Sequence, residues 1–491
     1  MDNEAKRGVP AWAWIVGLML FVSICVCGVL VAAVAMFVVG GSPVAQPPAP
    51  VAITVVADQP ATPPATATVP PTNTPAGEPT STAPAPETET PPAGEAPTGP
   101  TGPTGDPNAD VRARIEANVS DIRGLEPLEP VVTVLLSREE LRQRVEEDLF
   151  AELTQEDARD FTLLLNAFDF VPRDFDYYNF TLDLYAEQIA GFYDPETNEF
   201  VVVSDDAELD ALEQWTHAHE FVHALQDQYY DLDSLDDESM DSEASAALLS
   251  MVEGEAVLVQ NLYLLGGYFS FDELNQMLSQ STETESPVFD SAPPVLANDL
   301  IFPYTSGYEF MQTLYNQGGF DAIDEAWANP PQSTEHILHP DRYLAGDMPQ
   351  LVSIAPLTDT LGTGWRQLDQ DVFGEFYLRQ YLEQKLLAPQ VDSAASGWGG
   401  DQYAVYWNED TDGLVMVLRL AWDSAQDGEE FATALADYTT ASYGGPGRVE
   451  SDGGVCWQGS DVTCFYRLGD QSFIVRAPTL AMAQAIAAAQ P

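Results

Sequence analysis

The sequence predicts an α+β fold: a mostly helical domain with a small sheet or hairpin, then an α+β C-terminal region, all after an N-terminal transmembrane helix. Three observations support this architecture. Segments with helical hydrophobic periodicity dominate residues 110–345. Strand-like runs alternate with helical segments from about residue 400 onward. One long, almost unbroken apolar segment lies near the N-terminus.

The composition of the chain indicates which kinds of partner it can bind. Hydrophobic residues make up 45% of the 491 residues, which is enough for a sizeable core. The 18 basic residues face 78 acidic ones, for a formal net charge of −60. Such a charge repels nucleic acid and anionic membrane surfaces, so nucleic acid is not expected as a partner and any contact with a membrane is expected to come from an anchor. It fits an outer domain kept soluble by self-repulsion, or simply a solvated acidic surface without a specific partner.

The N-terminal residues predict a membrane anchor. The segment Ala11–Val39 is almost continuously apolar and exceeds the roughly 20 residues that a bilayer-spanning helix needs. Lys6 and Arg7 precede the segment, and the next basic residue is Arg112. By the positive-inside rule, the short N-terminus is expected in the cytoplasm and the rest of this single-pass chain outside the cell membrane. A cleaved signal peptide, with a cut near Ala45, is the alternative.

A segment rich in Pro, Thr, Ala and Gly follows the apolar one. It lacks the large apolar side chains that would offset the entropy of ordering, so a disordered, extended stalk is expected. The predicted parts of the chain are a cytoplasmic N-terminus (1–10), a transmembrane helix (11–39), the stalk (40–108), a helical domain with a hairpin (109–350) and a C-terminal α+β region (351–491).

The helical domain opens with residues 110–172, which are predicted to be helical. Two capping boxes indicate helix starts in this stretch. Ser137 and Glu140 form the first, and Thr154 and Asp157 form the second.

A predicted hairpin and two long helices follow. Residues 189–205 contain two runs rich in β-branched and aromatic residues around a Pro-containing turn, which is typical of a hairpin. Long helices are predicted at about 207–230 and 242–265, the second ending at a Gly pair. Further helices are predicted at about 272–280, 304–317, 320–327, 334–338, 371–386, 428–439 and 479–488, with strands at the runs LVMVLRLAW and SFIVRAP.

The first long helix carries the string HEFVH, residues 219–223, which has the H-E-x-x-H pattern. Positions i and i+4 of a helix lie on one face, so His219 and His223 are expected to bind one Zn²⁺ ion together. The ion would lower the pKa of a water molecule to about 7, and Glu220 is expected to take its proton as general base. All five histidines of the chain lie between residues 217 and 339, which argues against two unrelated surface histidines.

A zinc site of this kind needs a third protein ligand. No third histidine follows in the metzincin spacing, so that arrangement is excluded. The next helix carries Glu253 and Glu255, whose side chains point about 200° apart, so only one can face the metal ion. The helix is otherwise apolar here, and a buried carboxylate without a partner would be costly. The residues alone leave open which glutamate is the ligand, and a surface position fits the other.

An H-E-x-x-H motif followed by a glutamate on a downstream helix resembles the gluzincin group of zinc metallopeptidases. The string EGEA, residues 253–256, is similar to the E-G-x-A motif of several gluzincin-like families, in which the glutamate before the glycine binds zinc. The resemblance therefore implies Glu253 as the third metal ligand. It also implies that residues 109–350 form a zincin-like metallopeptidase domain with one catalytic Zn²⁺ ion.

Longer strings resemble a largely uncharacterised group of bacterial and archaeal metallopeptidases. The likeness covers roughly residues 185–345, and more loosely the chain from GWGGDQY onward. One position departs from the gluzincin pattern, because Val257 stands where the group has a carboxylate, so support for the metal ligands must come from elsewhere. The strings that carry the likeness are HEFVHALQDQ, EGEA, FPYTSGYEF and STEHILHPDRY.

Asp227 is a candidate for this support. It lies four residues after His223 on the same helix face, and a ligand histidine usually donates its other ring N–H to a carboxylate or carbonyl. A surface Asp is the alternative. His217 lies two residues before His219 on the opposite face, so a structural histidine is predicted there rather than a ligand.

A donor for the oxyanion of a tetrahedral intermediate is expected downstream of the ligand glutamate. Gluzincin-like enzymes place a His or Tyr in this part of the chain, and His336 and His339 share one face of a short helix or turn here. His339 is the first choice, and Tyr304 and Tyr308 are further candidates. Packing or capping roles are the alternative for each.

Two further features bear on cofactors and compartment. The acidic segment 231–245 connects the two helices of the predicted metal site and offers oxygen ligands for Ca²⁺. It lacks EF-hand spacing, and a solvated acidic loop is the alternative. Cys456 and Cys464 are predicted to form a small-loop disulfide, because an exported domain meets an oxidising environment. Two buried thiols are the alternative.

The sequence thus predicts a membrane-anchored, extracytoplasmic zinc metallopeptidase that hydrolyses protein or peptide substrates, with Glu220 as general base. A non-catalytic zinc-binding surface or adhesion module is the main alternative. Glu220 argues against that alternative, because a structural zinc site does not need a general base. A zinc hydrolase acting on another substrate, such as a cell-wall amide, is a third interpretation.

Overall fold

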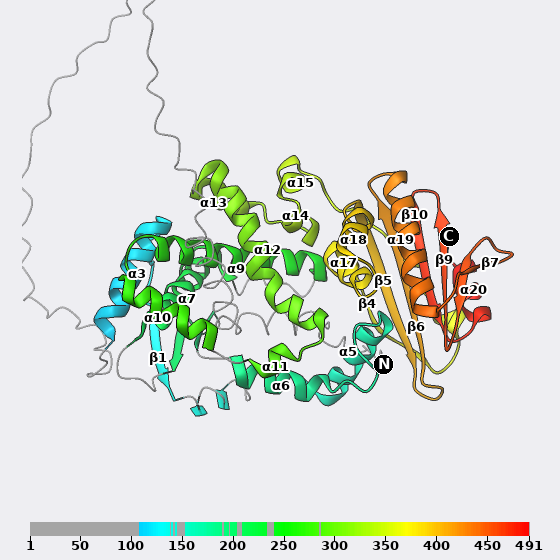
Figure 1. The fold of residues 1–491 in the computed structure, drawn as a ribbon, viewed down its shortest axis with the longest axis horizontal. Helices are drawn as coiled ribbons and strands as arrows, with labels where there is room; N and C mark the ends of the chain where they lie inside the picture. The colour runs from blue at the N-terminus through cyan, green and yellow to red at the C-terminus, as the bar shows by residue number, and fades with distance from the viewer. Residues whose placement is uncertain are drawn as a thin grey trace, which may run out of the picture. The chain divides into compact units, whose positions relative to one another are not determined.

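The computed structural model describes residues 108–490 except for 138, 141–142, 145–152, 189–190, 196, 204–208, 233–239 and 284–285 (Figure 1). The described residues fall in one compact unit that combines helices with two β-sheets, which confirms the predicted α+β class. The predicted cytoplasmic N-terminus (1–10), transmembrane helix (11–39) and nearly all of the stalk (40–108) lie outside the described residues.

A three-stranded sheet packs on the helix that carries HEFVH. Its strand order is β1 (Val132–Leu136), β3 (Glu199–Val203) and β2 (Gly191–Asp194). β2 and β3 pair antiparallel, which confirms the predicted hairpin and places β2 at an edge. β1 pairs parallel with β3, so the prediction of helices throughout residues 110–172 is wrong here. Three of the five side chains of β1 are β-branched, and such side chains favour a strand.

Two long helices carry the predicted metal site, and both begin at an aspartate cap. α7 (Ala211–Tyr230) starts after Asp210, whose side chain accepts from the backbone N–H of Glu213 in a capping box. This cap explains why α7 begins later than the predicted residue 207. α9 (Ser242–Leu265) starts after Asp241, at the predicted boundaries.

α7 and α9 lie antiparallel, and hydrogen bonds from side-chain N–H groups to backbone carbonyls join them on both sides of the predicted site. The indole Nε1 of Trp215 donates to the carbonyl of Gln260 at 3.1 Å, and the Gln260 amide donates back to the carbonyl of Trp215 at 3.1 Å. Further along α7, the Gln226 amide donates to the carbonyl of Val252 at 2.9 Å. The partners on α7 increase in residue number while those on α9 decrease, so the two helices run in opposite directions.

A third long helix, α12 (Pro294–Gly318), packs against α9 at a pair of glycines. A Cβ atom at Gly254 would lie 2.3 Å from the backbone carbon and oxygen of Gly307. A Cβ atom at Gly307 would lie 2.1 Å from the carbonyl oxygen of Ser250. Only glycine allows the two backbones to approach this closely, which explains the glycine between the two glutamates of EGEA.

The start of α12 differs from the prediction near residue 304. The helix begins at Pro294 and continues through Pro303, which is buried inside it. Proline lacks a backbone N–H and usually ends a helix, so the local pattern places the start after Pro303. The observed helix shows that packing against α9 overrides this local preference.

Several of the other helices in the first part of the chain pack against this group, whereas the helix that begins at Gln155 packs against the C-terminal sheet. The predicted capping boxes are both present, with Glu140 accepting from the backbone N–H of Ser137 at 2.9 Å and Asp157 accepting from that of Thr154 at 3.1 Å. The remaining helices in this part of the chain are α3 (Ala109–Arg123), α5 (Gln155–Ala167), α6 (Tyr177–Gln188), α10 (Phe271–Glu283), α11 (Pro287–Asp290), α13 (Phe320–Ala328), α14 (Thr334–Leu338) and α15 (Pro340–Ala345).

The C-terminal part of the chain forms a seven-stranded antiparallel sheet in the order β4-β5-β6-β10-β9-β8-β7. Successive side chains of β6 point to opposite faces of the sheet. Met416 packs against α19 on one face and Val417 packs against α20 on the other, so helices cover both faces of the sheet (Figure 1). The elements are α16 (Thr358–Leu361), β4 (Trp365–Asp371), α17 (Gly374–Glu383), α18 (Ala388–Ala395), β5 (Trp398–Asn408), β6 (Gly413–Trp422), α19 (Ala425–Tyr443), β7 (Arg448–Val449), β8 (Val455–Gln458), β9 (Val462–Leu468), β10 (Gln471–Ala477) and α20 (Leu480–Ala488).

The predicted disulfide is present in this sheet. Cys456 of β8 and Cys464 of β9 stand directly opposite each other in the antiparallel ladder. Their sulfur atoms are bonded at 2.05 Å, and both residues are buried.

Within the part of the chain that the structure describes, α9 alone is long and apolar enough to cross a bilayer. Its most apolar window is 78% buried in the protein, because α9 packs between α7 and α12. Its hydrophobicity is accounted for by this central place in the core.

Candidate metal centre

The three predicted metal ligands converge between α7 and α9. Nε2 of His219 lies 3.1 Å from Oε2 of Glu253, and Nε2 of His223 lies 3.4 Å from the same oxygen. The two ring nitrogens are 3.1 Å apart. Among the described residues, these three form the only group of His, Cys, Asp or Glu whose ligand atoms are close enough to hold one metal ion.

The spacing and the chemistry of these atoms fit zinc. A tetrahedral Zn²⁺ ion with bonds of about 2.0–2.1 Å keeps its ligand atoms about 3.3–3.4 Å apart, close to the observed triangle. Two imidazoles and one carboxylate form a donor set that catalytic zinc sites use. Oε1 of Glu253 and Nδ1 of His219 are buried without a hydrogen-bond partner. A cation at this point would offset the cost of burying the Glu253 carboxylate.

The site is buried, and within it His223 and Glu253 affect each other's pKa. His219 is 0% exposed and Glu253 is 1% exposed. Burial lowers the pKa of His223, but the charges of Glu253 and Glu220 outweigh it and raise this pKa to about 9. Burial raises the pKa of Glu253, but the adjacent His223 outweighs it and holds the pKa at about 2. His223 and Glu253 therefore each favour the charged form of the other.

Glu220, the predicted general base, lies beside the ligands and under the edge strand. Its Oε2 accepts a 3.2 Å hydrogen bond from the backbone N–H of Tyr193 in β2. Its Oε1 is buried and has no hydrogen-bond partner. The hairpin thus orients one oxygen of the carboxylate and leaves the other without a hydrogen bond.

His223 receives its support from Gln226 and not from the predicted Asp227. Nδ1 of His223 lies 2.8 Å from the amide oxygen Oε1 of Gln226. Asp227 instead accepts from the hydroxyl of Tyr193 at 2.8 Å and from the backbone N–H of Leu232 at 3.1 Å. The prediction that Asp227 supports His223 is therefore wrong. The acceptor is the amide three residues after the histidine, and the carboxylate four residues after it caps the end of α7.

Glu255, the second glutamate of EGEA, is not at the surface. It is 0% exposed and bonds to other partners than the three convergent side chains, which confirms that the two glutamates point in different directions. Its Oε2 accepts from the indole of Trp327 at 2.7 Å and from the Gln226 amide at 3.0 Å, and its Oε1 pairs with Arg123. The expectation of a surface glutamate fails because Arg123 from a distant helix, together with the two N–H donors, compensates the buried charge of the carboxylate.

His217 has the structural role that the sequence predicts. Its ring is buried in an edge-on contact with Phe200 at 4.6 Å, and its Nε2 lies 3.2 Å from a carboxylate oxygen of Glu116. Burial lowers the pKa of His217, although Glu116 acts in the opposite direction. It makes no contact with the three metal ligands.

The two histidines considered as oxyanion donors have partners elsewhere. Nε2 of His339 lies 3.0 Å from the buried carboxylate of Glu375 on α17, and this polar contact is not with a metal ligand. His336 accepts from the backbone N–H of Gln332 at 3.1 Å and donates to the carbonyl of Asp347 at 2.6 Å. Both ring nitrogens of His336 are thereby satisfied by backbone groups, which is a packing role.

Of the two candidate tyrosines, Tyr304 is the one beside the metal ligands. Its ring stacks on that of His219 with centroids 6.0 Å apart and an angle of 26° between the planes. Tyr308 lies one turn further along α12, and its hydroxyl accepts from the Gln312 amide at 2.5 Å. Position on α12 thus favours Tyr304 as a donor near the site.

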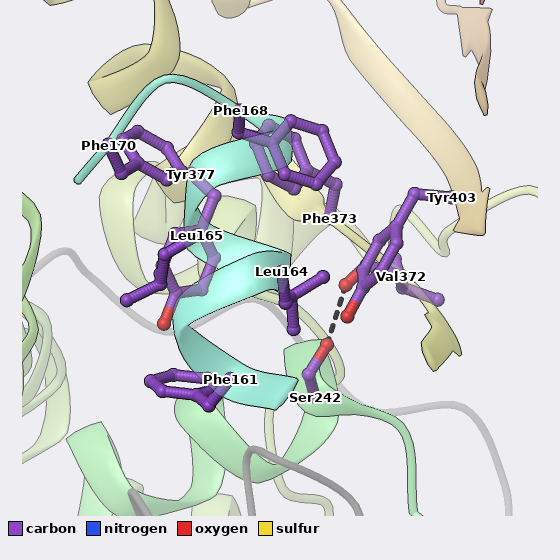
Figure 2. Close-up of a pocket in the computed structure, with 10 residues that line it drawn as sticks. All are labelled: Phe161, Leu164, Leu165, Phe168, Phe170, Ser242, Val372, Phe373, Tyr377 and Tyr403. Carbon is purple, nitrogen blue, oxygen red and sulfur yellow. Dashed lines mark hydrogen bonds between the residues drawn. The ribbon is translucent and has the colours of Figure 1, made fainter. Parts of the chain in front are cut away.

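An apolar pocket of about 50 Å³ lies outside the metal centre (Figure 2). Figure 2 shows side chains of α5 facing Phe373, Tyr377 and Tyr403, with the Ser242 hydroxyl bonded to the carbonyl of Val372. The rings of Phe168 and Phe373 stack at 4.4 Å. Its lining contains none of the predicted site residues.

The predicted calcium segment is only partly described, because residues 233–239 lie outside the described residues. Three of its described acidic residues have structural roles. Asp231 and Asp241 cap the ends of α7 and α9, and the buried Glu243 accepts from the backbone N–H and hydroxyl of Thr334, both at 2.8 Å.

Comparisons with known proteins bear on the C-terminal sheet and not on the metal centre. No curated protein and no solved structure matches the chain. Residues 361–487 match the model of a family described as a domain of unknown function, DUF8575, from the end of α16 into α20.

Proposed function

We propose that the chain is an extracytoplasmic zinc metallopeptidase that hydrolyses peptide bonds. The observation that carries this proposal is the convergence of His219, His223 and Glu253 beside the carboxylate of Glu220. These three side chains would hold the ion, which when bound polarises a carbonyl group and makes a water molecule more acidic. A structural zinc site commonly has four Cys or His ligands, whereas this group has three ligands and an adjacent general base.

The side chains of the site would divide the remaining work. Glu220, aligned by its bond from Tyr193, takes the proton of the attacking water on Oε1 and passes it to the leaving amine. Tyr304 is the side chain best placed to stabilise the oxyanion, because its ring lies against His219. β2 stands at the edge of its sheet, where an extended substrate could pair as an added strand.

The proposed location is the outer face of the cell membrane. The apolar segment Ala11–Val39 supports a single anchor with the N-terminus in the cytoplasm. The disulfide between Cys456 and Cys464 supports an oxidising compartment for the folded part. Substrates would then be proteins or peptides outside the cell.

A non-catalytic zinc-binding module is the second candidate, and the burial of the site favours it. Each of the three ligands is at most 3% exposed, so a substrate must reach a site that lies in the core. In that case the ion would contribute to folding and not to chemistry.

Metal removal distinguishes the two functions. A chelator is expected to abolish peptide hydrolysis while leaving the helical circular-dichroism signal unchanged, because α7 and α9 remain joined by the Trp215–Gln260 and Gln226–Val252 bonds. Added Zn²⁺ should restore the activity. The measurement pairs circular dichroism with cleavage of a mixed peptide library, and His223→Ala serves as the variant that zinc should not rescue.

Loss of the helical signal together with the ion would instead show a structural site. Undiminished hydrolysis after complete removal of the metal would contradict the proposed chemistry.

A further inference from the structure

The side chain of Gln226 connects a metal ligand to the second glutamate of EGEA. Its amide oxygen accepts from Nδ1 of His223 at 2.8 Å. Its amide nitrogen donates to Glu255 Oε2 at 3.0 Å and to the carbonyl of Val252 at 2.9 Å. Both partners of the nitrogen are pure acceptors, which fixes the orientation of the amide. Nδ1 of His223 must therefore carry a proton, and Nε2 is directed toward Glu253 and the ion.

Glu255 is held rigidly behind this amide. It is 0% exposed, and Arg123 of α3 pairs with it while being only 3% exposed itself. The indole of Trp327 donates to the same Oε2 that Gln226 uses, at 2.7 Å. Arg123 also bonds Asp324 of α13 at 2.5 Å, so the arginine that pairs with Glu255 is itself held by a further helix.

We propose that Gln226 and Glu255 are positioning residues for the metal ion, acting through His223. The carboxylate of Glu255 fixes the amide of Gln226, which in turn keeps the proton of His223 on Nδ1 and leaves Nε2 free to bind the ion. A hydrogen bond at the second nitrogen of a ligand histidine orients the ring and raises its basicity. This inference rests on the metal site of the proposed function and assigns the two glutamates of EGEA separate roles.

The assignment also gives α3 a role in the site. Arg123 is the last residue of α3 and lies 132 residues before its partner Glu255 in the chain. The pairing therefore depends on α3 docking against α9. Metal affinity is expected to depend on this distant helix, although α3 supplies no ligand.

The test measures zinc affinity of the full chain by competition with a chromophoric chelator. Gln226→Leu removes the acceptor for Nδ1, and Glu255→Gln removes the charge that fixes the amide. Each is expected to weaken zinc binding about 10–100-fold, the range typical of such outer partners. Glu116→Gln is the matched control. Glu116 of α3 contacts His217, which lies on α7 as Gln226 does, but it contacts no metal ligand, so the zinc affinity of this variant should stay within about twofold of wild type.

A spectroscopic readout separates positioning from a general loss of stability. With only five histidines, selective ¹⁵N labelling should resolve the ring nitrogens of His223 in the zinc-loaded chain. We expect a protonated Nδ1 and a metal-bound Nε2 in wild type, and loss of this fixed assignment in Gln226→Leu. If Glu255→Gln does not fold, Gln226→Leu decides alone.

The outcomes distinguish this inference from the proposed function. Wild-type affinity and an unchanged His223 spectrum in Gln226→Leu would overturn the positioning role while leaving the metal site intact. Failure of the wild-type chain to bind zinc would overturn both.

Discussion

Replacing Gly254 with alanine is expected to destabilise the protein by about 3 kcal/mol or more, the largest stability effect that we predict. The added Cβ would lie 2.3 Å from the backbone carbon and oxygen of Gly307. Extra methylenes in a packed core cost about 1–3 kcal/mol when side chains can move, and here the obstacle is backbone. α9 and α12 would have to separate, which would displace both Glu253 and Tyr304.

Chemical denaturation of Gly254→Ala and of a control measures this effect. Gly318→Ala is the matched control, because Gly318 lies at the exposed end of α12 and a Cβ there meets only the methyl group of Ala322 at 3.0 Å. Alanine should be neutral or slightly stabilising at Gly318, since it has the higher helix propensity. An unfolding midpoint for Gly254→Ala equal to that of wild type would contradict the close approach of α9 and α12.

Replacing Glu220 with glutamine is expected to lower kcat by about 10²–10⁴-fold while zinc affinity stays near that of wild type. Glutamine has the same shape and can keep the bond from the backbone N–H of Tyr193, but it cannot accept a proton from water. The carboxylate is not one of the three convergent ligands, so the ion should remain bound. Steady-state peptide hydrolysis and zinc content of the same preparation measure the two quantities.

His217→Gln controls for the change of a buried polar group on α7, because His217 contacts Glu116 and no metal ligand. It should alter stability more than kcat. Full hydrolytic activity in Glu220→Gln would show that the base lies elsewhere or that the reaction does not need one.

Local sequence patterns are sufficient to predict the two histidines of the site, whereas the choice of Glu253 over Glu255 rests on the resemblance to gluzincins. The four-residue spacing of His219 and His223 requires only a helix, which α7 provides. The apolar run around Glu253 likewise predicts a buried helix, and its boundaries agree with those observed for α9. The disulfide between Cys456 and Cys464 is predicted from their short spacing and from the expected export of the domain, and the ladder of β8 and β9 places the two residues face to face.

The supporting residues were not predictable in the same way, because they depend on contacts between distant segments. Gln226 and Asp227 both lie about one turn after His223, and only the packing against Val252 and Glu255 decides between them. Burial of Glu255 depends on Arg123, which no local pattern connects to it.

The strand β1 and the start of α12 illustrate the same limit. β1 becomes a strand through parallel pairing with β3, across more than sixty residues of chain. α12 continues through Pro303 because it packs on α9. A β-branched run at β1 was the available signal for the strand.

Anomalous diffraction at the zinc edge from zinc-loaded crystals tests the central claim most directly. The account predicts one peak per chain, about 2.0–2.2 Å from Nε2 of His219, Nε2 of His223 and a carboxylate oxygen of Glu253. A peak bound by other residues, or side chains of these three turned away from a common point in a chain that carries no zinc, would contradict it.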